Sequence, residues 1–279
     1  MALSIHTNYS ALITQTSLNK TNSSLGTNQQ RLSTGFRINS AADDAAGLQI
    51  ATRLNAQSRG MDVAMRNTQD GVSLLQTAEG AFQEMTDIMQ RMKDLATQAA
   101  NDTNSADDRT ALKSEFDALA AEVDNILGNT KYAGEALFAG GGKFTAAVNL
   151  QIGASAAETM AVDVSAALTT LNTEWTAAKA GTLDNAANAG AAITLMETAL
   201  DSVTAMRSDF GANINRLNHT ANNLANMRDN TEMAKGRIMD ADFARESANM
   251  TKNSMLMQSG ISMLRQAGQM PGMVMSLLG

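Results

Sequence analysis

Side chains able to do acid–base or metal chemistry are sparse in this sequence. The 279 residues include two histidines, His6 and His219, and no cysteine. Hydrolases, zinc proteases and nucleotide-binding proteins carry spaced sets such as Gly-x-Ser-x-Gly, His-Glu-x-x-His or a glycine-rich phosphate loop, and the sequence has none of them. Without cysteine there can be no disulfide and no thiolate metal site. The sequence therefore predicts a protein that is not an enzyme and holds no cofactor or metal.

Three acidic pairs could be imagined as a cation site or an acid–base pair: Asp43/Asp44, Asp107/Asp108 and Asp240/Asp242. Each pair precedes a stretch with helical spacing, where the positive end of the helix dipole favours carboxylates. Methionines recur between residues 61 and 92 and could suggest a soft-metal site, but methionine at helical spacing usually fills a core. We interpret the carboxylates as helix-start residues and the methionines as core residues.

The elements that must position these side chains are long helices. From Met61 to Ala99 the apolar or small residues fall at steps of three and four, which predicts a helix about 58 Å long with one face inward. Leu112–Ile126 and Ile193–Leu224 repeat the spacing, with Arg207 as a polar interruption. The predicted fold is mainly α, an elongated long-helix bundle or coiled coil. The residues expected along its seam are Phe82, Met85, Met89, Met92, Phe116, Leu119, Phe210, Ile214 and Leu217.

The two ends of the chain carry helical patterns that are too polar to fold alone. Leucines recur every seven residues near the N-terminus, but asparagine, glutamine, serine and threonine fill most positions between them. Either the two ends pair with each other or both pair with neighbouring subunits, and the second option would make this an assembling protein. The residues expected in this terminal coiled coil are Ile5, Leu12, Leu18, Leu25, Leu32, Met257, Ile261, Leu264, Leu277 and Leu278.

Glycines are used to place the helix boundaries. Gly35 and Gly60 bracket a stretch in which the apolar pattern is interrupted, so we expect a joint between them. Gly128 is expected to end a helix over about 106–127 that begins with a capping box between Ser105 and Asp108. Gly71 and Gly80 lie inside the first long helix, where close approach of another helix would explain them.

The hydrophobic period changes between 138 and 165. Phe144, Val148, Leu150 and Ile152 alternate, as do the apolar residues from Met160 to Val164, which predicts a small β-hairpin. Residues 165–190 are rich in alanine, threonine and asparagine, and they form a patch too short for a domain. The helical pattern resumes near Asn185 and continues to about Met227. We therefore expect a terminal domain of 1–40 plus 237–279 and a helical rod domain of 41–236.

Composition and charge exclude other classes. A net charge of −7 and a pI near 4.9 leave no dense basic cluster to neutralise a row of phosphates, so we expect no nucleic-acid partner. No segment approaches 18 apolar residues, and the first residues have neither a basic region nor an apolar run. We expect neither a membrane span nor a cleaved signal peptide, so any export uses another route.

Several long strings of the sequence resemble the signature blocks of bacterial flagellin, in the same order and spacing. These are RLSTGFRINSAADDAAGLQIATR (Arg31–Arg53), RNTQDGVSLLQTAEGAFQEM (Arg66–Met85), QAANDTNSADDR (Gln98–Arg109), LQIGASAAETMAVDV (Leu150–Val164), FGANINRLNHT (Phe210–Thr220), GRIMDADFARE (Gly236–Glu246) and RQAGQMPGMVMSLLG (Arg265–Gly279). The resemblance covers nearly the whole chain.

The resemblance implies a structural subunit that assembles into the flagellar filament for motility. It further implies secretion through the flagellar type III channel without a cleaved signal, help from an export chaperone and cap proteins, and a location in the extracellular filament. Most flagellins carry a large variable outer domain, but here the corresponding interval shrinks to about 165–190, so we expect that domain to be absent. Two alternatives are a flagellar hook-filament junction protein and a flagellin with an enzymatic variable region. The first usually lacks the full block from Arg66 to Arg109, and the second would need a variable domain.

The resemblance also implies a partner outside the bacterium. Met89–Gln98 is similar to the flagellin patch that the flagellin-sensing Toll-like receptor of animals recognises, which assigns Gln90, Arg91, Leu95 and Glu115 to a receptor patch. Arg91 and Leu95 are four residues apart, so an exposed arginine beside an apolar anchor could form a binding hot spot. Alternatively, Arg91 lies on a contact surface between subunits.

Overall fold

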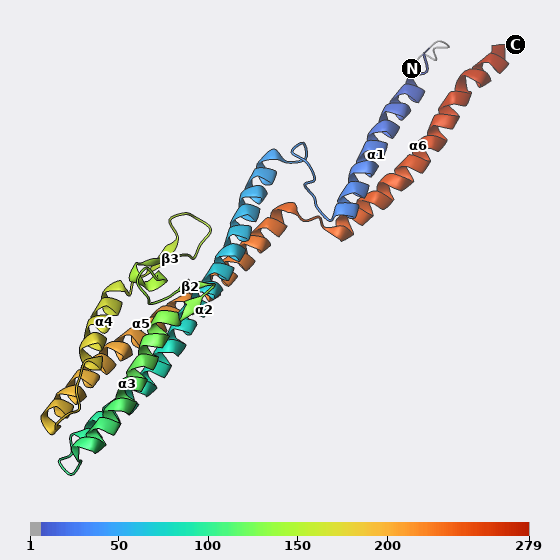
Figure 1. Ribbon diagram of the computed structural model, residues 1–279. Helices are drawn as coiled ribbons and strands as arrows, with labels where there is room; N and C mark the ends of the chain where they lie inside the picture. The colour runs from blue at the N-terminus through green and yellow to red at the C-terminus, as the bar shows by residue number, and fades with distance from the viewer. Residues whose placement is uncertain (1–6, 279) are drawn as a thin grey trace. The chain divides into compact units, whose positions relative to one another are not determined.

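The computed structural model describes residues 7–278, with the backbone alone described at 270–271 and 273–278. The helices are α1 (Tyr9–Thr34), α2 (Ala45–Ala99), α3 (Ala106–Asn129), η1 (Lys143–Thr145), α4 (Ser165–Lys179), α5 (Ala186–Met239) and α6 (Phe243–Leu278); the strands are β1 (Lys131–Tyr132), β2 (Glu135–Ala136), β3 (Val148–Gln151) and β4 (Thr159–Val162). Figure 1 shows how helices dominate the chain. The prediction of a mainly α long-helix bundle with a small β region is confirmed.

The chain divides into two compact units, which we describe separately. The terminal unit comprises Met1–Ala56 and Asn230–Gly279, and the rod unit comprises Gln57–Asp229. Both α2 and α5 contribute residues to each unit.

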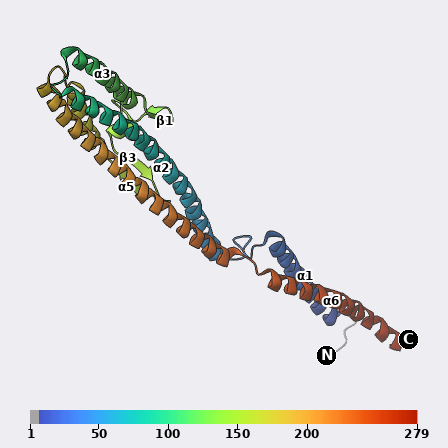
Figure 2. The ribbon, with the colours of Figure 1, turned by 90° about the horizontal axis from the view of Figure 1, so that it is seen from below.

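In the rod unit, α2 packs antiparallel to both α3 and α5 (Figure 2). Phe82 on α2 stacks on Phe210 of α5 with ring centroids 5.6 Å apart, and Phe138 and Phe144 complete an aromatic cluster at the same level. Because α2 is covered by helices on two sides, its buried stripe is wider than a coiled-coil seam. Arg207, the polar interruption in the α5 pattern, donates to the Glu79 carboxylate at 2.9 Å.

Two small antiparallel strand pairs lie against these helices. In the predicted hairpin, Val148 pairs with Val162 and Leu150 with Met160. Phe144, which we placed in the alternating run, lies instead in η1 and is fully buried. The second pair, β1 with β2, is two residues long on each side and was not predicted.

The helix α4 was missed, because 165–190 was interpreted only as a short alanine- and threonine-rich patch. Its leucines and Trp175 face the rod core, and the Trp175 indole nitrogen donates to Asp124 of α3 at 2.7 Å. Lys179 forms an ion pair with the same carboxylate at 3.1 Å. These contacts dock α4 against α3.

Three predicted boundaries were wrong. The joint that we placed between Gly35 and Gly60 ends at residue 44, because α2 begins at Ala45 and runs through Gly60. The capping box of Ser105 with Asp108 is confirmed, but α3 continues through Gly128 to a cap at Thr130. The last rod helix extends beyond the predicted end near Met227 to Met239.

The rod glycines have different neighbours from those we expected. A β-carbon added at Gly60 would lie 2.6 Å from the Ala154 β-carbon in the hairpin loop, and one at Gly71 would lie 2.7 Å from Leu150 in β3. The close approach is therefore made chiefly by the hairpin and not by a helix. At Gly80 nothing lies within 4 Å.

Two matched glycine substitutions in α2 test this packing. Gly60→Ala is expected to lower the free energy of unfolding by about 1–3 kcal/mol, because the new methyl group meets Ala154. Gly80→Ala is expected to raise it by about 0.5–1 kcal/mol, because alanine there gains helix propensity without a clash. Urea denaturation followed by circular dichroism measures both. Equal effects of the same sign would show that the hairpin does not seat on Gly60.

Candidate functional site

The two terminal helices pair with each other, antiparallel, in the terminal unit (Figure 1). The side chains least exposed along each helix follow a heptad rhythm, which is the narrow seam of a two-stranded coiled coil. On α1 they are Ala11, Thr14, Leu18, Thr21, Leu25, Asn28 and Leu32; on α6 they are Glu246, Met250, Asn253, Met257, Gly260, Leu264 and Ala267. About half of these residues are polar or small, so the pair buries little apolar surface within one subunit.

The residues predicted for the terminal coiled coil fall into three groups. Leu18, Leu25, Leu32, Met257 and Leu264 are half-buried on the seam. Leu12 and Ile261 are exposed and lie off the seam, so the structure does not bring them together with the first group. Ile5 lies outside the described residues, as do the side chains of Leu277 and Leu278.

A second set of apolar side chains on these helices points away from the seam. Leu12 is 51% exposed, and beside it on α1 lie the exposed Tyr9 and Ile13. On α6 the exposed apolar residues are Met255, Leu256, Ile261 and Met263. We call these seven residues the outer apolar face. Sequence reasoning missed Ile13, Met255, Leu256 and Met263 because they fall between the heptad positions, and their only signal is apolar character within a polar stretch.

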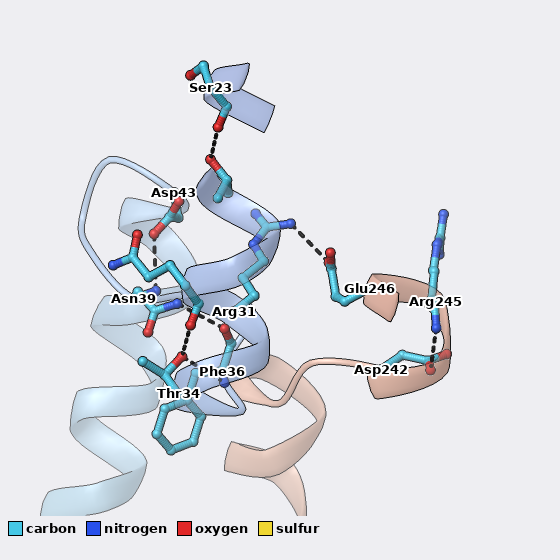
Figure 3. Close-up of polar contacts among 11 residues, drawn as sticks. Ser23, Arg31, Thr34, Phe36, Asn39, Asp43, Asp242, Arg245 and Glu246 are labelled. Carbon is cyan, nitrogen blue, oxygen red and sulfur yellow. Dashed lines mark hydrogen bonds and ion pairs between the residues drawn. The ribbon is translucent and has the colours of Figure 1, made fainter. Parts of the chain in front are cut away.

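A polar cluster sits on the seam where α1 ends and α6 begins. Arg31 donates to the Glu246 carboxylate at 3.2 Å, as Figure 3 shows. Asn28, also buried, is oriented so that its amide nitrogen donates to Glu246 at 3.3 Å and to the Ser24 carbonyl at 3.1 Å, while its oxygen accepts from Asn253. Buried polar pairs of this kind favour one register of a coiled coil over others.

The chain segments that adjoin this helix pair are tied together by backbone hydrogen bonds. Gly35 ends α1 in the left-handed conformation with φ at 75°, which glycine adopts at little cost. The Arg37 amide donates to the Met239 carbonyl at 2.6 Å, and the Ala241 amide donates to the Gly35 carbonyl at 2.9 Å. This bridge holds the segment after α1 against the segment before α6.

The acidic residues mostly stabilise helix starts and turns. Asp44 accepts from the Gly47 amide at 2.8 Å, and Asp242 accepts from the Arg245 amide at 3.1 Å (Figure 3). Amide hydrogen bonds from Asn39 and Ser40 lower the pKa of the Asp43 carboxyl. Asp240 differs from the prediction, because it follows α5 and forms a β-bridge with Phe36.

The second acidic pair, Asp107/Asp108, opens α3. The Ser105 hydroxyl donates to Asp108 at 2.7 Å and lowers the pKa of that carboxyl. Across the described part of the chain, no three histidine or acidic side chains are grouped to hold a metal ion. Within residues 7–278 no helix is long and apolar enough to cross a membrane.

Comparison with known proteins decides what kind of helical protein this is. The family model of the bacterial flagellin N-terminal helical region matches residues 5–143, and that of the C-terminal helical region matches 193–278. This chain belongs to the bacterial flagellin family. It is a structural subunit of the flagellar filament and not an enzyme.

Individual relatives agree with this assignment. The chain is 36% identical to flagellin A of Vibrio anguillarum over 381 positions that cover all of both proteins. It is 41% identical to a flagellin of Halalkalibacterium halodurans, with 89% of this chain and 90% of that one covered. A solved structure described as a flagellar hook-associated protein of Vibrio parahaemolyticus covers 71% of this chain with a TM-score of 0.57 and 13% identity, which indicates a shared fold alone.

This flagellin is a short form of the family. Its alignment with the Vibrio anguillarum protein extends over 381 positions although the chain has 279 residues, so the relative contains segments that are missing here. The interval between the hairpin and α5 holds only α4 and a short loop. The expected absence of a variable outer domain agrees with this comparison.

The residues named for the rod seam lie together in the rod unit. Phe82, Met85, Met89, Met92, Phe116, Phe210 and Leu217 are buried, and Leu119 and Ile214 pack half-buried against the same core.

The residues named for the receptor patch are only partly brought together. Gln90 is exposed, and Arg91 forms an ion pair with Glu115 of α3 at 2.7 Å on the rod surface. Leu95 is 1% exposed and belongs to the core, so the expectation of an exposed apolar anchor at this position was wrong. The reason is that α2 lies between α3 and α5, which together cover the side carrying Leu95.

Proposed function

We propose that this flagellin polymerises through the outer apolar face of its terminal helices. In this proposal, residues 1–40 and 237–279 form the filament-core domain, and residues 41–236 form the helical rod domain outside it. The supporting observation is that seven large apolar side chains lie exposed on two helices whose own seam is thin. Apolar surface gathered in this way marks an interaction site.

A second copy of the chain is the occupant that suits this face. The outer residues of α1 and α6 have the spacing of additional coiled-coil contacts, so that each helix pair can pack against helix pairs of neighbouring subunits. Repetition of one contact that does not close into a ring yields an open helical filament. Family membership supports the same occupant.

The other proposed partners act before polymerisation. We propose export through the flagellar type III channel without removal of a signal peptide, followed by addition at the growing tip beneath cap proteins. An export chaperone would cover the exposed apolar residues of α6 until assembly, because such residues otherwise promote aggregation. The resulting location is the extracellular filament.

Seeded polymerisation of the full chain tests the proposed function. Purified protein mixed with short filament fragments is expected to grow micrometre-long tubes that negative-stain electron microscopy resolves. Unseeded protein at the same concentration serves as the control for spontaneous aggregation. Protein that stays monomeric with seeds, at concentrations well above those in the unseeded control, would contradict the proposal.

Recognition by the flagellin-sensing Toll-like receptor of animals is proposed with a smaller patch than expected. Gln90, Arg91 and Glu115 are accessible, whereas Leu95 acts only through the core that supports them. Arg91→Ala is expected to weaken binding of the monomer to the receptor ectodomain by about 2 kcal/mol, because it removes an exposed hot-spot arginine. Lys113→Ala, a charge removal two turns along α3, is the matched control. Equal binding by wild type and Arg91→Ala would remove this patch from the receptor proposal.

A further inference from the structure

The methionines of this chain divide sharply by exposure. Seven of them are buried in the rod unit: Met61, Met85, Met89, Met92, Met160, Met196 and Met206. In contrast, Met255 is 61% exposed and Met263 is 59% exposed, both on α6. Met227 and Met233 near the end of α5 are exposed as well.

The two α6 methionines belong to the outer apolar face. Met263 follows Leu256 by seven residues and lies on the same side of α6, and Met255 is the immediate neighbour of Leu256. A thioether is apolar and flexible, so it fills contacts between helices well. Oxidation of its sulfur makes the same side chain polar and chiral, which disrupts methionine-rich interfaces.

We propose that Met255 and Met263 are oxidation sites that control the assembly competence of the free subunit. The oxidant is a two-electron peroxide. The methionine sulfur attacks one peroxide oxygen, an S–O bond forms and the O–O bond breaks, and the departing hydroxide takes up a proton to become water. Sulfur loses two electrons to the peroxide, and the product is the sulfoxide.

The consequence rests on the proposed function, since it requires the outer apolar face to be buried between subunits. A sulfoxide at either position replaces apolar contact by a polar group that must be desolvated, so oxidised subunits join the filament poorly. Once the face is buried, the same sulfurs are shielded from peroxide. The proposal therefore predicts a monomer that is sensitive and a filament that is resistant.

Peroxide treatment of the full-length monomer, followed by peptide mass spectrometry and seeded polymerisation, tests the proposal. Sulfoxide is expected at Met255 and Met263 about tenfold faster than at the buried Met85 and Met89. The critical concentration for polymerisation is expected to rise about tenfold after this treatment. Reduction by a methionine sulfoxide reductase with a thiol reductant is expected to restore the untreated value.

Matched double variants separate these two sites from the other exposed methionines. Met255→Leu/Met263→Leu keeps apolar volume and is expected to polymerise normally after peroxide treatment, whereas Met227→Leu/Met233→Leu remains sensitive. Equal peroxide sensitivity of the two double variants would overturn the proposal. If the first variant does not polymerise even untreated, the wild-type mixture decides: sulfoxide at both sites must be enriched in the unassembled fraction, and equal content in the filament overturns the proposal. Failure of untreated wild type to polymerise would instead refute the proposed function itself.

Discussion

Replacing Phe82 with alanine is expected to lower the free energy of unfolding of the rod unit by about 3–5 kcal/mol. The Phe82 ring is fully buried and contacts Phe138 with centroids 4.7 Å apart and Phe210 with centroids 5.6 Å apart. Its removal leaves a cavity where α2, α5 and the segment before the hairpin meet, and rigid helices cannot close around it fully. Thermal melting followed by circular dichroism is expected to show a midpoint about 10 °C lower.

The control for this prediction is Gln90→Ala on the same helix. Gln90 is exposed, and its truncation is expected to change stability by no more than about 0.5 kcal/mol. Gln83 would be a poor control, although it too is exposed, because its side chain accepts a hydrogen bond from Arg207. If Phe82→Ala melted together with Gln90→Ala and wild type, the aromatic cluster could not be the centre of the rod core.

Leu256→Asp is expected to abolish polymerisation under conditions in which wild type assembles. Leu256 is 48% exposed on the outer apolar face, so the change should leave the fold of the subunit intact. In the filament it would bury an unpaired carboxylate, at a cost of about 3 kcal/mol or more for each contact, which raises the critical concentration about 100-fold. Sedimentation of polymer after seeding measures the loss.

Gln258→Asp is the matched control for this charge. Gln258 is exposed on the same helix but away from the apolar residues, so an added carboxylate there stays in solvent. The control should polymerise nearly as wild type does, and both variants should melt at the wild-type temperature. Normal filament yield from Leu256→Asp would show that this side of α6 is not a subunit contact.

The sequence predicts the long helices and the main hairpin because their hydrophobic periods are sustained. The step of three and four through Met85, Met89 and Met92 is the direct imprint of a buried helix face. The alternation of the hairpin residues follows in the same way from a strand with one covered face. The capping box at Ser105 was predictable because both partners lie within four residues of each other.

The parts that failed depend on contacts between distant residues. Helix α4 has little apolar contrast, and its anchor, Trp175, meets Asp124 51 residues away. Gly128 was taken as a helix end, yet a glycine in open space is tolerated inside a helix that tertiary packing supports. Leu95 appeared exposed because the sequence shows one seam, whereas α2 is covered on two sides.

The terminal helices show a different limit of sequence analysis. Their heptad leucines identify the seam within one subunit, but the outer apolar face becomes visible only when exposure is known residue by residue. For this reason the predicted assembly residues mixed seam positions such as Leu18 with outer positions such as Leu12.

Single-cysteine labelling in the filament tests the central claim most directly, namely that the outer apolar face is buried between subunits. The chain has no cysteine, so Leu12→Cys introduces a unique thiol at an exposed position of α1. A maleimide is expected to label the monomer rapidly and the filament at least about tenfold more slowly, with full labelling restored after the filament is dissociated. Labelling of the filament as fast as the monomer would contradict the account.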